Sequence, residues 1–105
     1  MASPSRKEQL EAMLVDEPND PLLRYMLAME HASAGNDAQA IACFRDLLAR
    51  SSDYVPAYQQ MGQALVRLGR DAEAREAWRQ GVAKARQQGN EHASTEMQGM
   101  IDMLD

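Results

Sequence analysis

The chain is poor in the residues that build β-sheets and disulfide-bonded domains. Its 105 residues include one phenylalanine, one tryptophan, one cysteine, two isoleucines and four valines. A sheet needs branched and aromatic side chains on its packed faces, and a single cysteine excludes an internal disulfide. Alanine, leucine, methionine, glutamine, glutamate and arginine, which favour helices, dominate the chain instead. The composition therefore predicts an all-α protein.

Neither charge nor hydropathy indicates a nucleic-acid or membrane partner. The eleven basic residues are interleaved with sixteen acidic ones, giving a net charge of −5. A nucleic-acid-binding surface needs basic residues gathered in a patch or stripe. No apolar run is long enough to span a bilayer, and the N-terminal residues lack the apolar core of a signal peptide. We therefore expect a cytoplasmic protein that binds neither nucleic acid nor a membrane.

The residues that could carry chemistry are dispersed. His31, Cys43 and His92 do not have the spacing of metal ligands, and the sequence contains no nucleophile elbow or glycine-rich phosphate loop. We expect no catalytic residue, no metal site and no cofactor. A small thiol or metal-dependent enzyme, with Cys43 as the candidate thiol, is an alternative from a different functional class.

The sequence repeats itself at an offset of 34 residues. Within fifteen aligned positions there are six identities and one exchange of aromatic residues, which is difficult to attribute to chance. The aligned pairs are Gly35 and Gly69, Asp37 and Asp71, Ala38 and Ala72, Ala40 and Ala74, Phe44 and Trp78, Arg45 and Arg79, and Ala49 and Ala83.

Each copy is expected to form two helices. Gly35 and Gly69 suit the left-handed position that ends a helix, and Asp37 and Asp71 are candidate caps of the helices that follow. Connections this short produce antiparallel helix hairpins. With a helix before and after the copies, the sequence predicts about six helices in a single domain over residues 1–105. The segments are an N-terminal helix at 5–17, repeats at 21–54 and 55–88, and a C-terminal capping helix at 90–104.

The repeat resembles the tetratricopeptide repeat, whose pattern is W-x2-L-G-x2-Y followed by an alanine and an aromatic residue. The second copy matches the pattern better than the first, in which Arg24 and His31 replace the usual aromatic residues. The matching residues are Tyr58, Met61, Gly62, Leu65, Ala74 and Trp78 in the second copy, and Arg24, Leu27, Ala28, His31, Ala40 and Phe44 in the first. The resemblance implies antiparallel hairpins stacked as a short right-handed α-solenoid, since stacking buries the face that one hairpin leaves exposed.

The resemblance also implies a function and a site. Tetratricopeptide proteins bind other proteins, usually on a concave face formed by the first helix of each hairpin. On this ground we expect an adaptor that holds a peptide or helix of a partner protein without catalysis. The expected peptide-binding residues are Leu22, Tyr25, Met29, Ser33, Gln59, Gln63, Val66 and Arg67.

The C-terminal segment allows a second interpretation within the same fold. Its sequence "MQGMIDML" is rich in methionine, which packs adaptably in cores and at docking surfaces. The segment could cap the array, or it could form a dimer contact in a self-associating scaffold. A homodimer through this helix or through the open edge of the stack is therefore an alternative.

Overall fold

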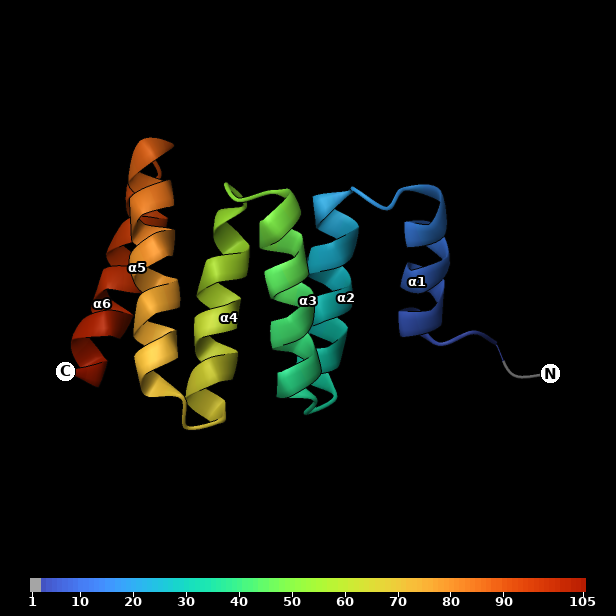
Figure 1. The fold of residues 1–105 in the computed structure, drawn as a ribbon, viewed down its shortest axis with the longest axis horizontal. Coiled ribbons are helices and arrows are strands. Elements are labelled where there is room, and N and C mark those ends of the chain that lie inside the picture. The colour runs from blue at the N-terminus through green and yellow to red at the C-terminus, as the bar shows by residue number, and fades with distance from the viewer. Residues whose placement is uncertain (1–2) are drawn as a thin grey trace. The chain divides into compact units, whose positions relative to one another are not determined.

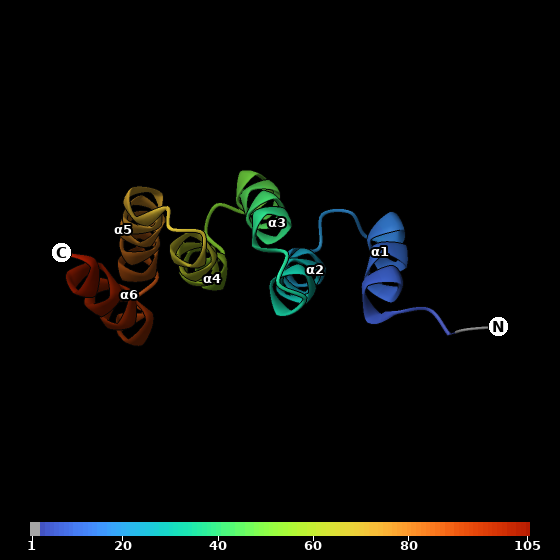
Figure 2. The same ribbon diagram turned by 90° about the horizontal axis from the view of Figure 1, so that it is seen from below.

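The computed structural model describes residues 3–105, which form six α-helices and no β-strand (Figures 1 and 2). The helices are α1 Arg6–Asp16, α2 Pro21–Ser33, α3 Asp37–Arg50, α4 Val55–Arg67, α5 Asp71–Gln87 and α6 Glu91–Leu104. The all-α prediction and the number of helices are confirmed. Contacts divide the chain after Ser52 into a first unit containing α1–α3 and a second unit containing α4–α6.

Side-chain caps start three of the helices. Ser5 and Glu8 form a capping box at the start of α1, because each side chain bonds to the backbone of the other residue. Asp20 accepts hydrogen bonds from the backbone of Leu22 and Leu23 at the start of α2. Asn90 accepts one from Ala93 at the start of α6. These bonds satisfy backbone N–H groups that have no partner within a helix.

The predicted caps at Asp37 and Asp71 are wrong. Each aspartate is the first residue of its helix, and the capping positions are held by Asn36 and Arg70, whose side chains make no capping bond. An acidic side chain in the first turn still interacts favourably with the helix dipole. The preceding glycines have positive φ angles, 81° at Gly35 and 75° at Gly69, as expected for residues that end a helix.

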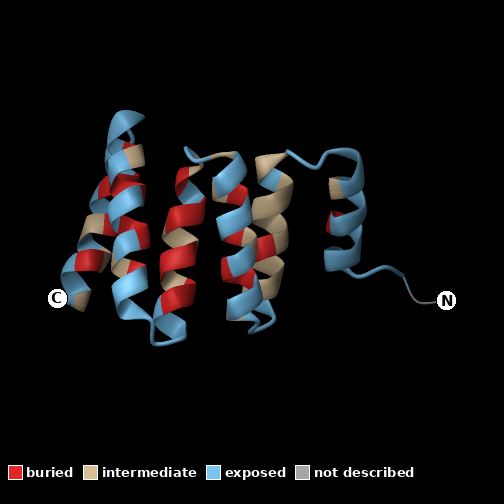
Figure 3. Ribbon diagram, in the orientation of Figure 1, coloured by how far each residue is buried: buried red, intermediate tan, exposed pale blue. Residues whose placement is uncertain are grey.

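In the first unit, α2 packs against both α1 and α3. The rings of Tyr25 and Phe44 contact each other with centroids 6.1 Å apart. Arg24 of α2 forms an ion pair with Asp46 of α3. Helix α1 buries only Leu10, and most of its surface is exposed (Figure 3).

In the second unit, α5 packs against both α4 and α6. Helices α4 and α5 carry many of the buried residues in Figure 3. Two glycines allow the close approach. A Cβ atom at Gly62 would overlap the indole of Trp78, and one at Gly81 would lie 2.7 Å from Cβ of Tyr58. The same Cβ position at Gly81 would lie 2.5 Å from Sδ of Met97 on α6, so the missing side chain lets both α4 and α6 approach α5 closely.

None of the helices in residues 3–105 has both the length and the apolar character needed to cross a membrane.

Candidate interaction surface

The structure places the eight predicted binding residues in two sets, one in each unit. Leu22, Tyr25, Met29 and Ser33 lie on α2, and Gln59, Gln63, Val66 and Arg67 lie on α4.

The α2 set is partly engaged within the first unit. Tyr25 and Met29 are half-buried, and the ring of Tyr25 packs against Phe44 of α3. Leu22 and Ser33, near the two ends of the helix, are exposed. This set therefore offers two exposed side chains and the outer surfaces of two partly packed ones.

The α4 set borders a groove within the second unit. The cavity has a volume of about 430 Å³ and includes residues from all three helices of the unit. We name it the α4–α6 groove. Its lining consists of Gln63, Val66 and Arg67 from α4, Trp78 from α5, and Met100, Met103 and Leu104 from α6.

Trp78 forms the floor of the α4–α6 groove because Gly62 leaves room for its ring. The indole lies against the backbone of α4 at Gly62, and its Nε1 donates a hydrogen bond to the carbonyl oxygen of Gln59, 3.1 Å away. The polar group of the tryptophan is thus satisfied inside the protein. What the ring contributes to the groove is apolar surface. Gln59 itself acts here through its backbone and does not line the cavity.

Helix α6 supplies the opposite wall and is held at its end by α5. Arg75 of α5 forms an ion pair with Asp105 at 2.9 Å and also donates a hydrogen bond to the carbonyl oxygen of Leu104. Met103 is 87% exposed, and Met100 and Leu104 are half-buried. Unbranched methionine side chains adapt to different apolar partners. The groove can therefore accept an apolar side chain, with the amide of Gln63 available for a hydrogen bond.

Three of the seven lining residues, Gln63, Val66 and Arg67, belong to the predicted set. The sequence-based choice of site residues followed only the first helix of each repeat. It therefore missed the other four lining residues, which are Trp78, Met100, Met103 and Leu104. The methionine-rich composition of the C-terminal segment was the available signal, and it left open a cap, a docking surface and a dimer contact. The structure adds that α6 packs against α5, and the docking surface and the dimer contact stay predictions.

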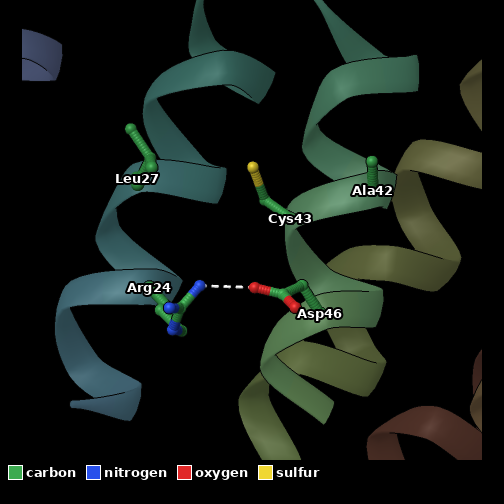
Figure 4. Close-up of a pocket in the computed structure, with 5 residues that line it drawn as sticks. All are labelled: Arg24, Leu27, Ala42, Cys43 and Asp46. Atoms are coloured by element: carbon green, nitrogen blue, oxygen red, sulfur yellow. Dashed lines mark hydrogen bonds and ion pairs between the residues drawn. The ribbon is translucent and has the colours of Figure 1, made fainter. Parts of the chain in front are cut away.

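A second cavity, of about 190 Å³, lies between α2 and α3 beside the single cysteine (Figure 4). Arg24, Leu27, Ala42, Cys43 and Asp46 line it, and the Arg24–Asp46 ion pair crosses one side. Burial, aided by the negative charge of Asp46, raises the pKa of the Cys43 thiol, while Arg24 acts in the opposite direction. A raised pKa keeps the sulfur protonated at neutral pH, and the thiol is a poorer nucleophile than the thiolate. The environment of Cys43 thus does not favour a thiol enzyme.

A metal-dependent enzyme has no geometric support in the described part of the chain. Residues 3–105 contain no group of three or more histidine, cysteine, aspartate or glutamate side chains that could hold a metal ion.

Comparison with known proteins identifies relatives over nearly the whole chain. A family model for the tetratricopeptide repeat matches residues 55–83. A TPR repeat-containing protein of Pseudomonas aeruginosa is 32% identical over 98 residues, which cover 93% of both chains.

Solved structures of similar sequence have a similar fold. A protein of Bordetella parapertussis, known from its solution structure, is 30% identical, with a TM-score of 0.84 over 97% of this chain and 89% of its own. A tetratricopeptide repeat domain protein of Salinibacter ruber is 34% identical. Its crystal structure gives a TM-score of 0.75 over 81% of this chain and 94% of its own.

Proposed function

The chain belongs to the tetratricopeptide repeat family, and we propose that it binds a peptide or helix of another protein in the α4–α6 groove, without catalysis. Domains of this family generally mediate protein–protein interactions. The groove is the observation that carries the proposal, because it joins three of the predicted binding residues to an apolar wall from α6. A concave, mostly apolar site with a few polar groups is typical of a ligand-binding surface.

The chemistry of the groove indicates what part of a partner it would hold. Trp78, Met100 and Leu104 offer apolar surface, and Gln63 offers an amide at the α4 side. An amphipathic helix or an extended segment could bury one or two apolar side chains there. The α2 set of Leu22, Tyr25, Met29 and Ser33 is proposed as a second contact patch, in the first unit.

A pair of matched valine substitutions tests the groove. Val66 lines the groove and is 36% exposed, whereas Val15 on α1 is 80% exposed and lies outside it. We expect Val66→Glu to weaken the captured partner's affinity at least about tenfold, because a carboxylate would be desolvated against apolar groups. Val15→Glu should bind as the wild type does.

The measurement is a pull-down from native lysate, followed by titration of the purified partner against each variant. Circular dichroism must show equal helix content, so that unfolding does not mimic a lost contact. Equal affinities of the two variants would contradict the proposed groove and move the binding surface elsewhere.

Self-association through α6 is the second candidate function. The observation favouring it is Met103, which is 87% exposed on α6 beside the groove. Light scattering coupled to size exclusion distinguishes self-association from partner binding, since a monomer at every concentration would exclude self-association.

A further inference from the structure

The corner between α1 and α2 contains a different kind of groove. Its volume is about 300 Å³. The lining consists of two apolar side chains and three acidic ones, namely Met13, Leu23, Asp16, Glu17 and Asp20. We name this site the α1–α2 corner. It contains no basic residue, in contrast to the α4–α6 groove, which includes Arg67.

Two of its carboxylates lack a neutralising partner. Asp20 accepts hydrogen bonds from the backbone N–H groups of Leu22 and Leu23 at the start of α2. Asp16 and Glu17 form no ion pair with any residue that the structure describes. Both are exposed at the end of α1. The corner therefore presents negative charge that the fold itself does not balance.

Two arginines hold the loop between α1 and α2 and pair with Asp46, not with the carboxylates of the corner. Arg24 donates from Nε to the carbonyl oxygen of Pro18 at 2.5 Å, and it also pairs with Asp46. Arg50 donates a hydrogen bond to Oδ1 of Asn19 at 2.7 Å, and its Nε lies 3.5 Å from Oδ2 of Asp46. These contacts tie the loop to α2 and α3, so the groove is formed before any partner arrives.

The floor of the α1–α2 corner is apolar and accessible. Met13 is 52% exposed on α1, and Leu23 is half-buried on α2. The carboxylates around this floor do not belong to any cluster that could hold a metal ion in residues 3–105. Exposed apolar surface bordered by one sign of charge is complementary to a segment of opposite charge.

We propose that the α1–α2 corner binds a basic amphipathic segment of a partner protein. Lysine or arginine side chains of the segment pair with Asp16 and Glu17, and an apolar side chain between them lies against Met13 and Leu23. The charges orient the segment and speed its association, and the apolar contact slows its release. This surface is separate from the α4–α6 groove, so either site can fail its test without affecting the other.

A synthetic peptide in which two lysines flank a leucine is the probe. It is titrated against the whole chain at low salt by calorimetry, while the methionine methyl signals are followed by NMR. We expect the Met13 signal to shift. Adding salt should weaken binding, because exposed charges are screened over about 10 Å at 0.1 M ionic strength.

Neutralising variants test the role of the two carboxylates. Asp16→Asn with Glu17→Gln should weaken the peptide about three- to tenfold, as expected for two exposed ion pairs. Glu91→Gln with Asp102→Asn changes the net charge equally but lies on α6, and it should leave affinity unchanged.

Each of four results would overturn the proposal. Equal weakening by both double variants would mean that only net charge matters. Equal binding of a peptide with glutamines in place of the lysines would remove the charge contacts. Absence of binding at low salt, or a shift confined to Met100 and Met103, would show that the corner is not the site.

Discussion

Gly62 lets α4 pack closely on α5, because any larger residue at this position would overlap Trp78. The position of a Cβ atom at Gly62 coincides with the ring of Trp78, which is buried and hydrogen-bonded to Gln59. The same ring forms the floor of the α4–α6 groove. A single missing methyl group therefore supports both the packing of the hairpin and the shape of the proposed binding site.

We expect Gly62→Ala to lower the free energy of unfolding by about 1–3 kcal/mol. Overpacking displaces a buried side chain and costs this much, here with the Trp78 hydrogen bond at risk as well. Alanine's greater helix propensity recovers at most about 1 kcal/mol. The measurement is urea unfolding followed by tryptophan fluorescence.

Gly99 of α6 is the matched control for that substitution. A Cβ atom at Gly99 would meet nothing within 4 Å, so Gly99→Ala has only the helix-propensity gain, about 1 kcal/mol. We therefore expect Gly62→Ala to lower the free energy of unfolding and Gly99→Ala to raise it. A stabilised Gly62→Ala variant would show that the Trp78 ring can move without cost.

At the scale of the helix, α1 is the element least supported by burial. It is 11 residues long and buries only Leu10, and its further ties are the capping box at Ser5 and an ion pair between Arg6 and Glu30. Helices of this length are marginal in water without tertiary packing. One side chain therefore carries most of the docking of α1 onto α2.

Leu10→Ala should release α1 while the second unit stays folded. Hydrogen exchange followed by mass spectrometry would show the amides of α1 losing protection and those of α4 and α5 unchanged. Val15→Ala is the control, because Val15 is exposed on the same helix and its truncation removes little packing. Unfolding of both units by Leu10→Ala would contradict this division of stability.

The helices could be predicted from the sequence because their signals are local. Gly35 and Gly69 were predicted to end helices, and the structure confirms both. Asp37 and Asp71 were predicted as caps, but each is the first residue of its helix. The error arose because an aspartate is favourable both as a cap and within the first turn.

The candidate site depended on contacts that no local signal contains. Val66 was assigned to a binding face through the resemblance to tetratricopeptide repeats, in which the first helix of each hairpin forms that face. Val66, Met100 and Leu104 line one cavity because α4 and α6 both pack against α5. The α1–α2 corner similarly required the positions of Met13 and Leu23 on two helices.

At the scale of the whole molecule, each unit has its own core and its own groove. The first unit carries the acidic α1–α2 corner, and the second carries the apolar α4–α6 groove. Occupation of both proposed sites by two segments of one partner would strengthen its binding.

Each unit also contains a group whose pKa is raised in the folded protein. Burial raises the pKa of Cys43 in the first unit, with Asp46 adding to the effect. Burial also raises the pKa of Tyr58 in the second unit, with Asp53 adding to it. The folded chain therefore retains these two protons at pH values where the unfolded chain has begun to lose them.

Stability is accordingly expected to fall on the alkaline side. The contribution is fully present below the unfolded pKa values, about 8.5 for a thiol and about 10 for a phenol. This contribution to the free energy of unfolding is lost as the pH rises through the pKa values of the folded chain, because the unfolded chain then binds fewer protons than the folded one. Urea unfolding from pH 7 upward, followed by circular dichroism, measures the slope. Cys43→Ala should remove the part of the fall in unfolding free energy that occurs at lower pH. Tyr58→Phe should remove the part that occurs at higher pH. An unchanged slope in Cys43→Ala would mean that the thiol titrates alike in the folded and unfolded chains.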